Sequence, residues 1–96
     1  MLNWYLIYTK QRQEDLVADK LREHGLEVFN PKLTVRKTVR RRAKKVTSAL
    51  FPNYLFAKFD PSENQRLVKY ATGVRRIVGF NETPTPVDQS IIDGIS

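Results

Sequence analysis

Short runs of strand-forming residues, several with alternating hydrophobic and polar positions, recur along the chain. Residues 4–8 and 54–59 are the clearest, because aromatic and β-branched residues dominate them. A short strand is expected over 26–29, before a turn at Asn30–Pro31, and another strand over 74–80. These runs predict a protein whose framework is a β-sheet.

Residues 13–24 carry the spacing of an amphipathic helix. Acids stand early in this stretch, as the helix dipole prefers, and Gly25 follows it in the position that commonly ends a helix. The apolar positions predict one buried stripe, made of Leu16, Val17, Ala18 and Leu21.

A second helix has a recognisable N-terminus. Asp60 is the expected N-cap, Pro61 the first helical residue and Glu63 the third. The helix is expected to run to about residue 71, where Thr72 and Gly73 end it, and to bury Leu67, Val68 and Ala71. A last short helix, capped by Asp88, carries Ile91, Ile92 and Ile95.

The stretches 33–39 and 46–50 are extended in pattern and flank a basic stretch at 40–45, which predicts a β-hairpin with a cationic tip. The tip lacks Gly and Asn-Gly, so a loosely held loop is expected there. With 81–86 read as loop, the order of elements favours an α+β sandwich: a mainly antiparallel sheet with two helices on one face. A chain of 96 residues forms one domain, residues 1–96.

Strand parity sorts the side chains of the two clearest strands onto two faces. One face is expected to lie under the helices and carries Tyr5, Ile7, Thr9, Leu55, Ala57 and Phe59. The other carries Trp4, Leu6, Tyr8, Tyr54, Phe56 and Lys58. If the strands are neighbours, the apolar members of the second set form an exposed patch with Phe51 at its edge, which is typical of a partner site. The alternative is that the hairpin or the last helix folds over this face.

The net charge of +7 has a local origin. Seven cations fall within ten residues, and without them the rest of the chain is neutral: Arg36, Lys37, Arg40, Arg41, Arg42, Lys44 and Lys45. Such a cluster favours polyanions, nucleic acid first, although a solvated face is an equally open interpretation. Its neighbours are Thr and Val rather than aromatics, which argues against a base-stacking platform.

A weaker polar set combines the start of the first helix with the residues after the second: Lys10, Gln13, Lys20, Thr72, Arg75 and Arg76. In an α+β sandwich these two regions can lie side by side. An amide could then meet a base edge while the cations take phosphates.

Catalysis and metal binding find little support in the sequence. The chain has no Cys and a single His, His24, and it contains neither a P-loop nor a GxGxxG motif. We therefore expect a binding module without enzymatic activity, cofactor or metal. No stretch is long enough to cross a bilayer and no signal peptide is evident, so a cytoplasmic protein is expected. We also expect it to be a monomer.

Three blocks of the sequence resemble the N-terminal domain of the NusG family of transcription elongation factors, in the family's order. They are residues 4–10, residues 50–56 with Phe59 and Asp60, and residues 71–74. The resemblance implies a domain that binds the clamp helices of the largest RNA polymerase subunit and reduces pausing or termination. It assigns that contact to Leu6, Tyr8, Phe51, Tyr54 and Phe56, the patch that strand parity had indicated.

The details of the opening strand and of 50–61 are closest to the specialised RfaH members of the family, which also read a non-template DNA element. The positions that correspond to their DNA contacts are Lys10, Gln13, Lys20 and Thr72. The chain departs from the RfaH members in three places. It lacks the Arg that follows the Thr in those members, so Gly73 comes directly after Thr72, and it has Leu16 where they have an Arg. Residues 64–66 do not match the residues with which those members make a second contact with the polymerase. The C-terminal KOW domain usual in the family is expected to lie beyond this chain. The alternative function is a stand-alone nucleic-acid-binding domain of RRM-like shape, although the usual RNP sequence is missing.

Overall fold

The computed structural model describes residues 1–39, 41–80 and 83–95. Its framework is a five-stranded sheet in which every pairing is antiparallel. The strands lie in the order β2 (Glu27–Phe29), β5 (Tyr54–Phe59), β1 (Asn3–Thr9) and β6 (Val74–Ile77), and β9 (Pro86–Val87) pairs with the start of β1. The expected α+β sandwich with a mainly antiparallel sheet is confirmed.

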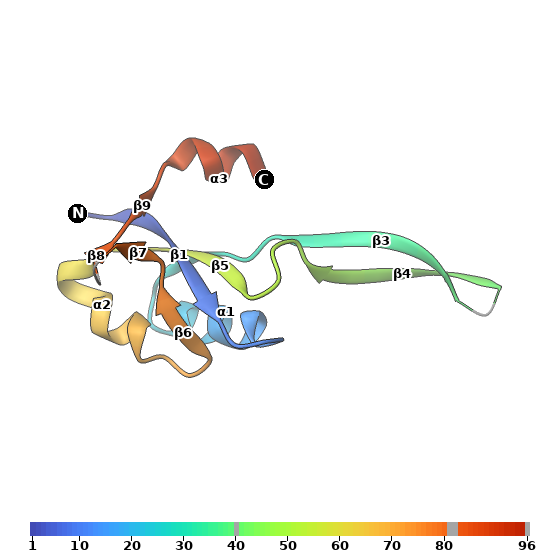
Figure 1. The fold of residues 1–96 in the computed structure, drawn as a ribbon, viewed down its shortest axis with the longest axis horizontal. Coiled ribbons are helices and arrows are strands. Elements are labelled where there is room, and N and C mark those ends of the chain that lie inside the picture. The colour runs from blue at the N-terminus through green and yellow to red at the C-terminus, as the bar shows by residue number, and fades with distance from the viewer. Residues whose placement is uncertain (40, 81–82, 96) are drawn as a thin grey trace.

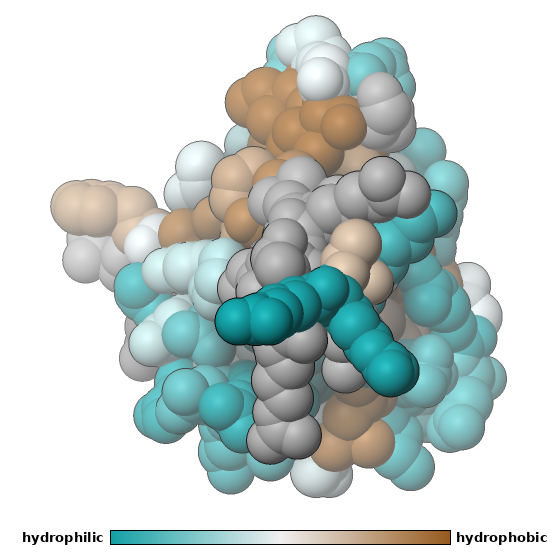
Figure 2. Space-filling model, turned by 90° about the vertical axis from the view of Figure 1, so that its right-hand side faces the viewer, coloured by the Kyte–Doolittle hydropathy of each residue, from teal (hydrophilic) through white to brown (hydrophobic). Residues whose placement is uncertain are grey.

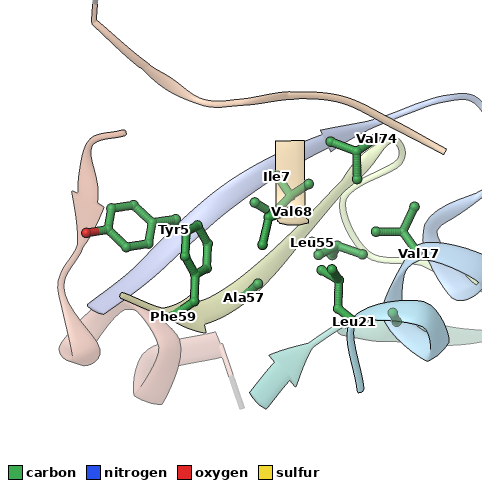
Figure 3. Close-up of a cluster of buried hydrophobic side chains, with 10 residues drawn as sticks. Tyr5, Ile7, Val17, Leu21, Leu55, Ala57, Phe59, Val68 and Val74 are labelled. Carbon is green, nitrogen blue, oxygen red and sulfur yellow. The ribbon is translucent and has the colours of Figure 1, made fainter. Parts of the chain in front are cut away.

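Two helices, α1 (Glu14–Glu23) and α2 (Pro61–Lys69), cover one face of this sheet (Figure 1). The main hydrophobic core lies between the helices and the sheet, where side chains from β1 and β5 meet Val17, Leu21 and Val68 (Figure 3). The face assigned by parity is therefore correct. Leu16 is an exception to the expected helical stripe, because it is 42% exposed while Val17 and Leu21 are fully buried.

The N-terminus of α2 is capped as its sequence predicts. Asp60 has extended backbone dihedrals, and its Oδ1 accepts a hydrogen bond from the backbone N–H of Ser62 at 3.0 Å. The N-terminal ammonium of Met1 also donates to Asp60, at 2.7 Å. That ammonium, together with the Ser62 hydroxyl and N–H, lowers the pKa of Asp60 to about 2. Val68 is the fully buried residue of this helix, whereas Leu67 and Ala71 are half-buried.

The short helix α3 (Gln89–Ile95) lies on the opposite face of the sheet from α1 and α2 (Figure 1). Asp88 caps it as expected, with Oδ1 accepting from the N–H of Ser90 at 2.9 Å. Ile92 of α3 packs with Trp4 and Phe56 in a second, smaller core. The indole Nε1 of Trp4 donates a 2.7 Å hydrogen bond to Oε1 of Gln89, so α3 is held over one end of this face.

The hairpin of β3 (Lys32–Val39) and β4 (Arg42–Ala49) projects from the sheet and gives the molecule its longest dimension, 53 Å (Figure 1). Its base is tied to α1, because Asp15 accepts from Asn30 at 2.8 Å and pairs with Lys32. The expectation of a loop is wrong for residues 42–45, which belong to β4, and residue 40 lies outside the described residues. Pairing continues to Val39↔Arg42, so most of the basic stretch is strand. The pairing of β3 with β4 therefore continues into residues for which the absence of Gly and Asn-Gly had predicted a loose loop.

The predicted strand over 74–80 is also interrupted. Strand β6 ends at Ile77, and the next two residues that pair belong to β7 (Gly79–Phe80), which forms a small hairpin with β8 (Thr83–Pro84). The N–H of Val78 still donates to the carbonyl of Leu6 in β1 at 2.9 Å, so the chain leaves the main sheet only after Val78. The expected loop at 81–86 therefore contains β8 and the first residue of β9.

We expect Ile92→Ala to release α3 from the sheet while the main core stays folded. Removing a buried Ile side chain costs about 2–5 kcal/mol in a rigid core, and a short peripheral helix can relieve that cost by undocking. Trp4 is the single Trp of the chain, so its fluorescence should shift to the red and become accessible to quenchers. Ile91→Ala is the matched control, because Ile91 is 51% exposed on the same helix. An unchanged Trp4 spectrum in Ile92→Ala would contradict the expectation.

Candidate functional site

An apolar cluster, which we call the aromatic patch, lies on the sheet face that carries α3. It consists of Leu6, Tyr8, Phe51, Tyr54 and Phe56. The pairing of β1 with β5 sets Leu6 opposite Phe56 and Tyr8 opposite Tyr54. The rings of Tyr8 and Tyr54 are 5.1 Å apart, a distance typical of attractive aromatic pairs. The register of β1 and β5 therefore brings together patch residues that are far apart in the sequence.

The turn that connects the hairpin with β5 holds one side of the patch. The N–H of Tyr54 donates to the carbonyl of Phe51 at 3.0 Å, and Asn53 has φ 71°. A Pro at the second position and a positive φ at the third are the signature of a type II turn, and Asn tolerates that conformation better than most residues. The sequence Phe51-Pro52-Asn53-Tyr54 is therefore compatible with this turn, which places the two aromatic residues at its ends.

Leu6, Phe51, Tyr54 and Phe56 line a shallow apolar hollow of about 180 Å³. Phe51 stands at its rim, 40% exposed, with its ring edge-on to Phe56 at 6.4 Å. The hollow has the size and chemistry to receive apolar side chains from a partner.

The extent of the predicted patch needs correction. Phe56 is only 6% exposed and Trp4 only 5%, since α3 covers both and Phe29 lies 6.0 Å from the Phe56 ring. The last helix therefore folds over part of this face, which is the alternative that parity left open. Phe56 forms the floor of the hollow, and the accessible part of the patch belongs mainly to Phe51, Tyr54 and Tyr8.

Two of the predicted DNA-binding cations lie beside the aromatic patch. The guanidinium carbons of Arg75 and Arg76 are each 5.9 Å from the centre of the Tyr8 ring, within cation–π range. Both residues are exposed on β6. They give the patch a positive rim along β6, which pairs with β1 on the side opposite β5.

The segment that leads from β1 into α1 touches the loop after α2. The N–H of Lys10 donates to the carbonyl of Gly73 at 2.8 Å. Gly73 has φ 91°, and a Cβ atom there would lie 2.8 Å from both Gln13 Oε1 and Val17 Cγ2. The structure therefore brings Lys10 and Gln13 beside Thr72 and Gly73, as the sandwich arrangement predicted.

Lys20 and Thr72 both line an open groove of about 320 Å³ between α1 and α2. Sequence analysis missed three polar residues that share this groove: His24, Arg66 and Tyr70. A signal was present, because Lys20 and His24 are four residues apart on one helix, and Arg66 and Tyr70 are four apart at the end of the other. Tyr70 is 71% exposed, so the groove offers an aromatic face among cations.

The third basic region is the hairpin. Arg41, Arg42 and Lys45 are exposed near its end, whereas Arg40 lies outside the described residues. Figure 2, which looks at the molecule from the hairpin side, shows hydrophilic side chains standing in front and a hydrophobic area above, where α3 lies in Figure 1. The described members of the predicted DNA-binding set thus lie on β6, at the junction of β1 with α1 and the loop after α2, and on the hairpin.

Within the described part of the chain, no group of three or more His, Asp or Glu residues is placed to hold a metal ion. Among the same residues, no helix is long and apolar enough to span a bilayer.

Comparison with known proteins agrees with the fold. A family model described as "Transcription termination factor nusG" matches residues 2–96. A solved structure described as "Domain interaction in Thermotoga maritima NusG" is similar over 99% of this chain, with a TM-score of 0.66 and 21% sequence identity. The match covers 55% of that protein, so the present chain spans about half of its length.

We expect Gly73→Ala to destabilise the protein by roughly 2 kcal/mol, more than Gly25→Ala does. Both glycines have positive φ, but a Cβ at Gly25 meets nothing within 4 Å, whereas one at Gly73 clashes with Gln13 and Val17. Gly25→Ala therefore measures backbone strain alone, and the difference between the variants measures the contact. Urea unfolding followed by circular dichroism gives both values. Equal destabilisation would contradict the close approach of the two segments.

Proposed function

The chain belongs to the NusG family of transcription factors, and from this premise we propose that it binds RNA polymerase through the aromatic patch. The clamp helices of the largest subunit are the proposed partner, and bound there the domain reduces pausing or termination. The observation that supports this most is the turn that presents Phe51 and Tyr54 beside an open apolar hollow. We also propose that the domain acts in the cytoplasm and that it binds its partners without catalysing a reaction.

The chemistry of the patch suits an amphipathic helix as partner. Such a helix inserts apolar side chains, spaced three or four residues apart, into a hydrophobic groove. The 180 Å³ hollow would take one of them, while Tyr54 and Tyr8 offer flat aromatic surfaces next to it. Arg75 and Arg76 on the rim favour acidic residues on the polar side of that helix.

Nucleic acid is the second proposed partner and contacts the basic regions outside the patch. Lys10, Gln13, Lys20 and Thr72 lie where the two helices and the end of β1 meet, and we assign them to an exposed non-template strand. The hairpin cations Arg41 and Arg42, with Arg40 beside them in sequence, are assigned to the phosphates of upstream DNA. The rim residues Arg75 and Arg76 add to the positive field between these regions.

The stand-alone RRM-like alternative is less well supported. Domains of that kind stack bases on aromatic residues exposed across the open sheet face. Here α3 covers Trp4 and Phe56 on that face, so a continuous stacking platform is not available.

Phe51→Ala and Tyr54→Ala should each weaken binding to an isolated clamp-helix segment by about tenfold or more, because buried aromatic anchors dominate such interfaces. Isothermal calorimetry or fluorescence anisotropy measures the affinity. Phe80→Ala is the matched control, since Phe80 is 78% exposed but lies on β7 outside the patch. Phe56 is avoided because its burial would mix folding with binding. Unchanged affinity in both patch variants would refute the proposed interface.

Replacing Arg41 and Arg42 together by Gln should weaken binding to duplex DNA and reduce the salt slope of log K by about 2, because each lost phosphate contact removes roughly one released counterion. The control is Lys58→Gln with Lys69→Gln, which removes the same charge from β5 and α2, outside the hairpin. An equal change in slope for both double variants would show that net charge, rather than the hairpin, sets DNA affinity.

A further inference from the structure

The backbone of Asn53 is held from outside its own turn at both of its polar groups. Its carbonyl accepts a hydrogen bond from the N–H of Thr9 at 2.8 Å. Its N–H donates to Oε1 of Glu14, also at 2.8 Å. Asn53 lies between the two aromatic residues that flank the hollow, so whatever fixes its peptide groups also fixes the direction in which Phe51 and Tyr54 point.

The second of these bonds depends on the type of turn. Type I and type II turns share the same closing hydrogen bond but differ in the dihedrals of the two central residues. They differ by a flip of the central peptide, here the one that joins Pro52 to Asn53. With φ 71° at Asn53, the N–H of this peptide faces Glu14. After a flip to type I, that N–H would point away from the carboxylate and φ would become negative.

Glu14 is unusual among the acids of this chain. It is the first residue of α1 and only 8% exposed, although charged residues are almost never buried without a partner. The main core does not explain the choice of a carboxylate at this position, whereas the Asn53 N–H does. A charged acceptor makes a stronger hydrogen bond than a neutral one, and burial strengthens it further.

We propose that Glu14 is a positioning residue for the aromatic patch: its carboxylate selects the type II turn and so holds Phe51 and Tyr54 in their binding geometry. The inference rests on the proposed function for its effect on affinity, but its effect on the turn is independent of any partner. Glu14 does not touch the open surface of the patch and acts through the backbone of Asn53.

The test compares Glu14→Ala with Glu14→Gln. The alanine variant removes the acceptor, and the glutamine variant keeps an oxygen at the Oε1 position. In Glu14→Ala we expect amide exchange at Asn53 to accelerate about tenfold or more and the strong NOE from Pro52 Hα to the Asn53 amide proton, characteristic of type II, to weaken. Affinity for the clamp-helix segment should fall about tenfold, equivalent to about 1.4 kcal/mol. Glu14→Gln should stay within about threefold of the parent chain in affinity, because an amide oxygen still accepts the bond.

Two control variants separate positioning from general effects. Glu23→Ala removes the same charge from the exposed far end of α1, and Val68→Ala destabilises the core without touching the turn. Well below the unfolding temperature, both should keep the affinity and the Asn53 signals of the parent chain. An affinity loss in Val68→Ala as large as in Glu14→Ala would assign the effect to lost stability and overturn the proposal.

The two proposals fail in different ways. If the parent chain does not bind the clamp segment, the proposed partner is wrong, and the Asn53 exchange rate and NOE still decide the role of Glu14. If the parent chain binds and Glu14→Ala binds equally well, or if Asn53 is unchanged in Glu14→Ala, the positioning role is overturned.

Discussion

The antiparallel pairing of β1 with β5 is the interaction on which the other features of this domain depend. Six consecutive pairs, from Asn3↔Phe59 to Tyr8↔Tyr54, fix the two strands in one register. Because side chains alternate between faces, a slip of one residue would exchange the core set with the patch set. The full burial of Ile7, Leu55 and Phe59 under the helices makes that slip costly, and so the main core holds the aromatic patch on the opposite face.

The end of β1 connects this pairing with the proposed binding regions. Two successive residues donate to different loops: the N–H of Thr9 to Asn53 and the N–H of Lys10 to Gly73. One loop carries the aromatic patch, and the other lies beside the groove between α1 and α2. Glu14 follows shortly after and adds a buried contact to the first loop. A short segment thus positions the surface proposed for polymerase and the one proposed for DNA relative to the same strand.

The hairpin cations stand apart from the hollow of the aromatic patch, which suits the two kinds of partner proposed above. The hollow of the patch is lined by apolar residues, whereas the exposed hairpin cations stand on a projecting element that leaves the sheet beyond the patch. Helix α3 limits the apolar area further by covering Trp4 and Phe56. Less apolar surface in contact with water reduces non-specific association.

The sequence by itself determined the features that depend on local physics. Alternation assigned the faces of β1 and β5, and Asp60 and Pro61 marked the start of α2. The three blocks that resemble the NusG family predicted the fold and the patch residues from the sequence alone. The tertiary structure decided what depends on distant segments: the burial of Phe56 under Ile92, the break after Ile77, and the extension of the hairpin to Val39↔Arg42. It alone revealed the contact between Glu14 and Asn53, which are 39 residues apart. Local propensity depends on neighbouring residues, whereas burial and long-range hydrogen bonds arise only when the folded chain brings remote residues together.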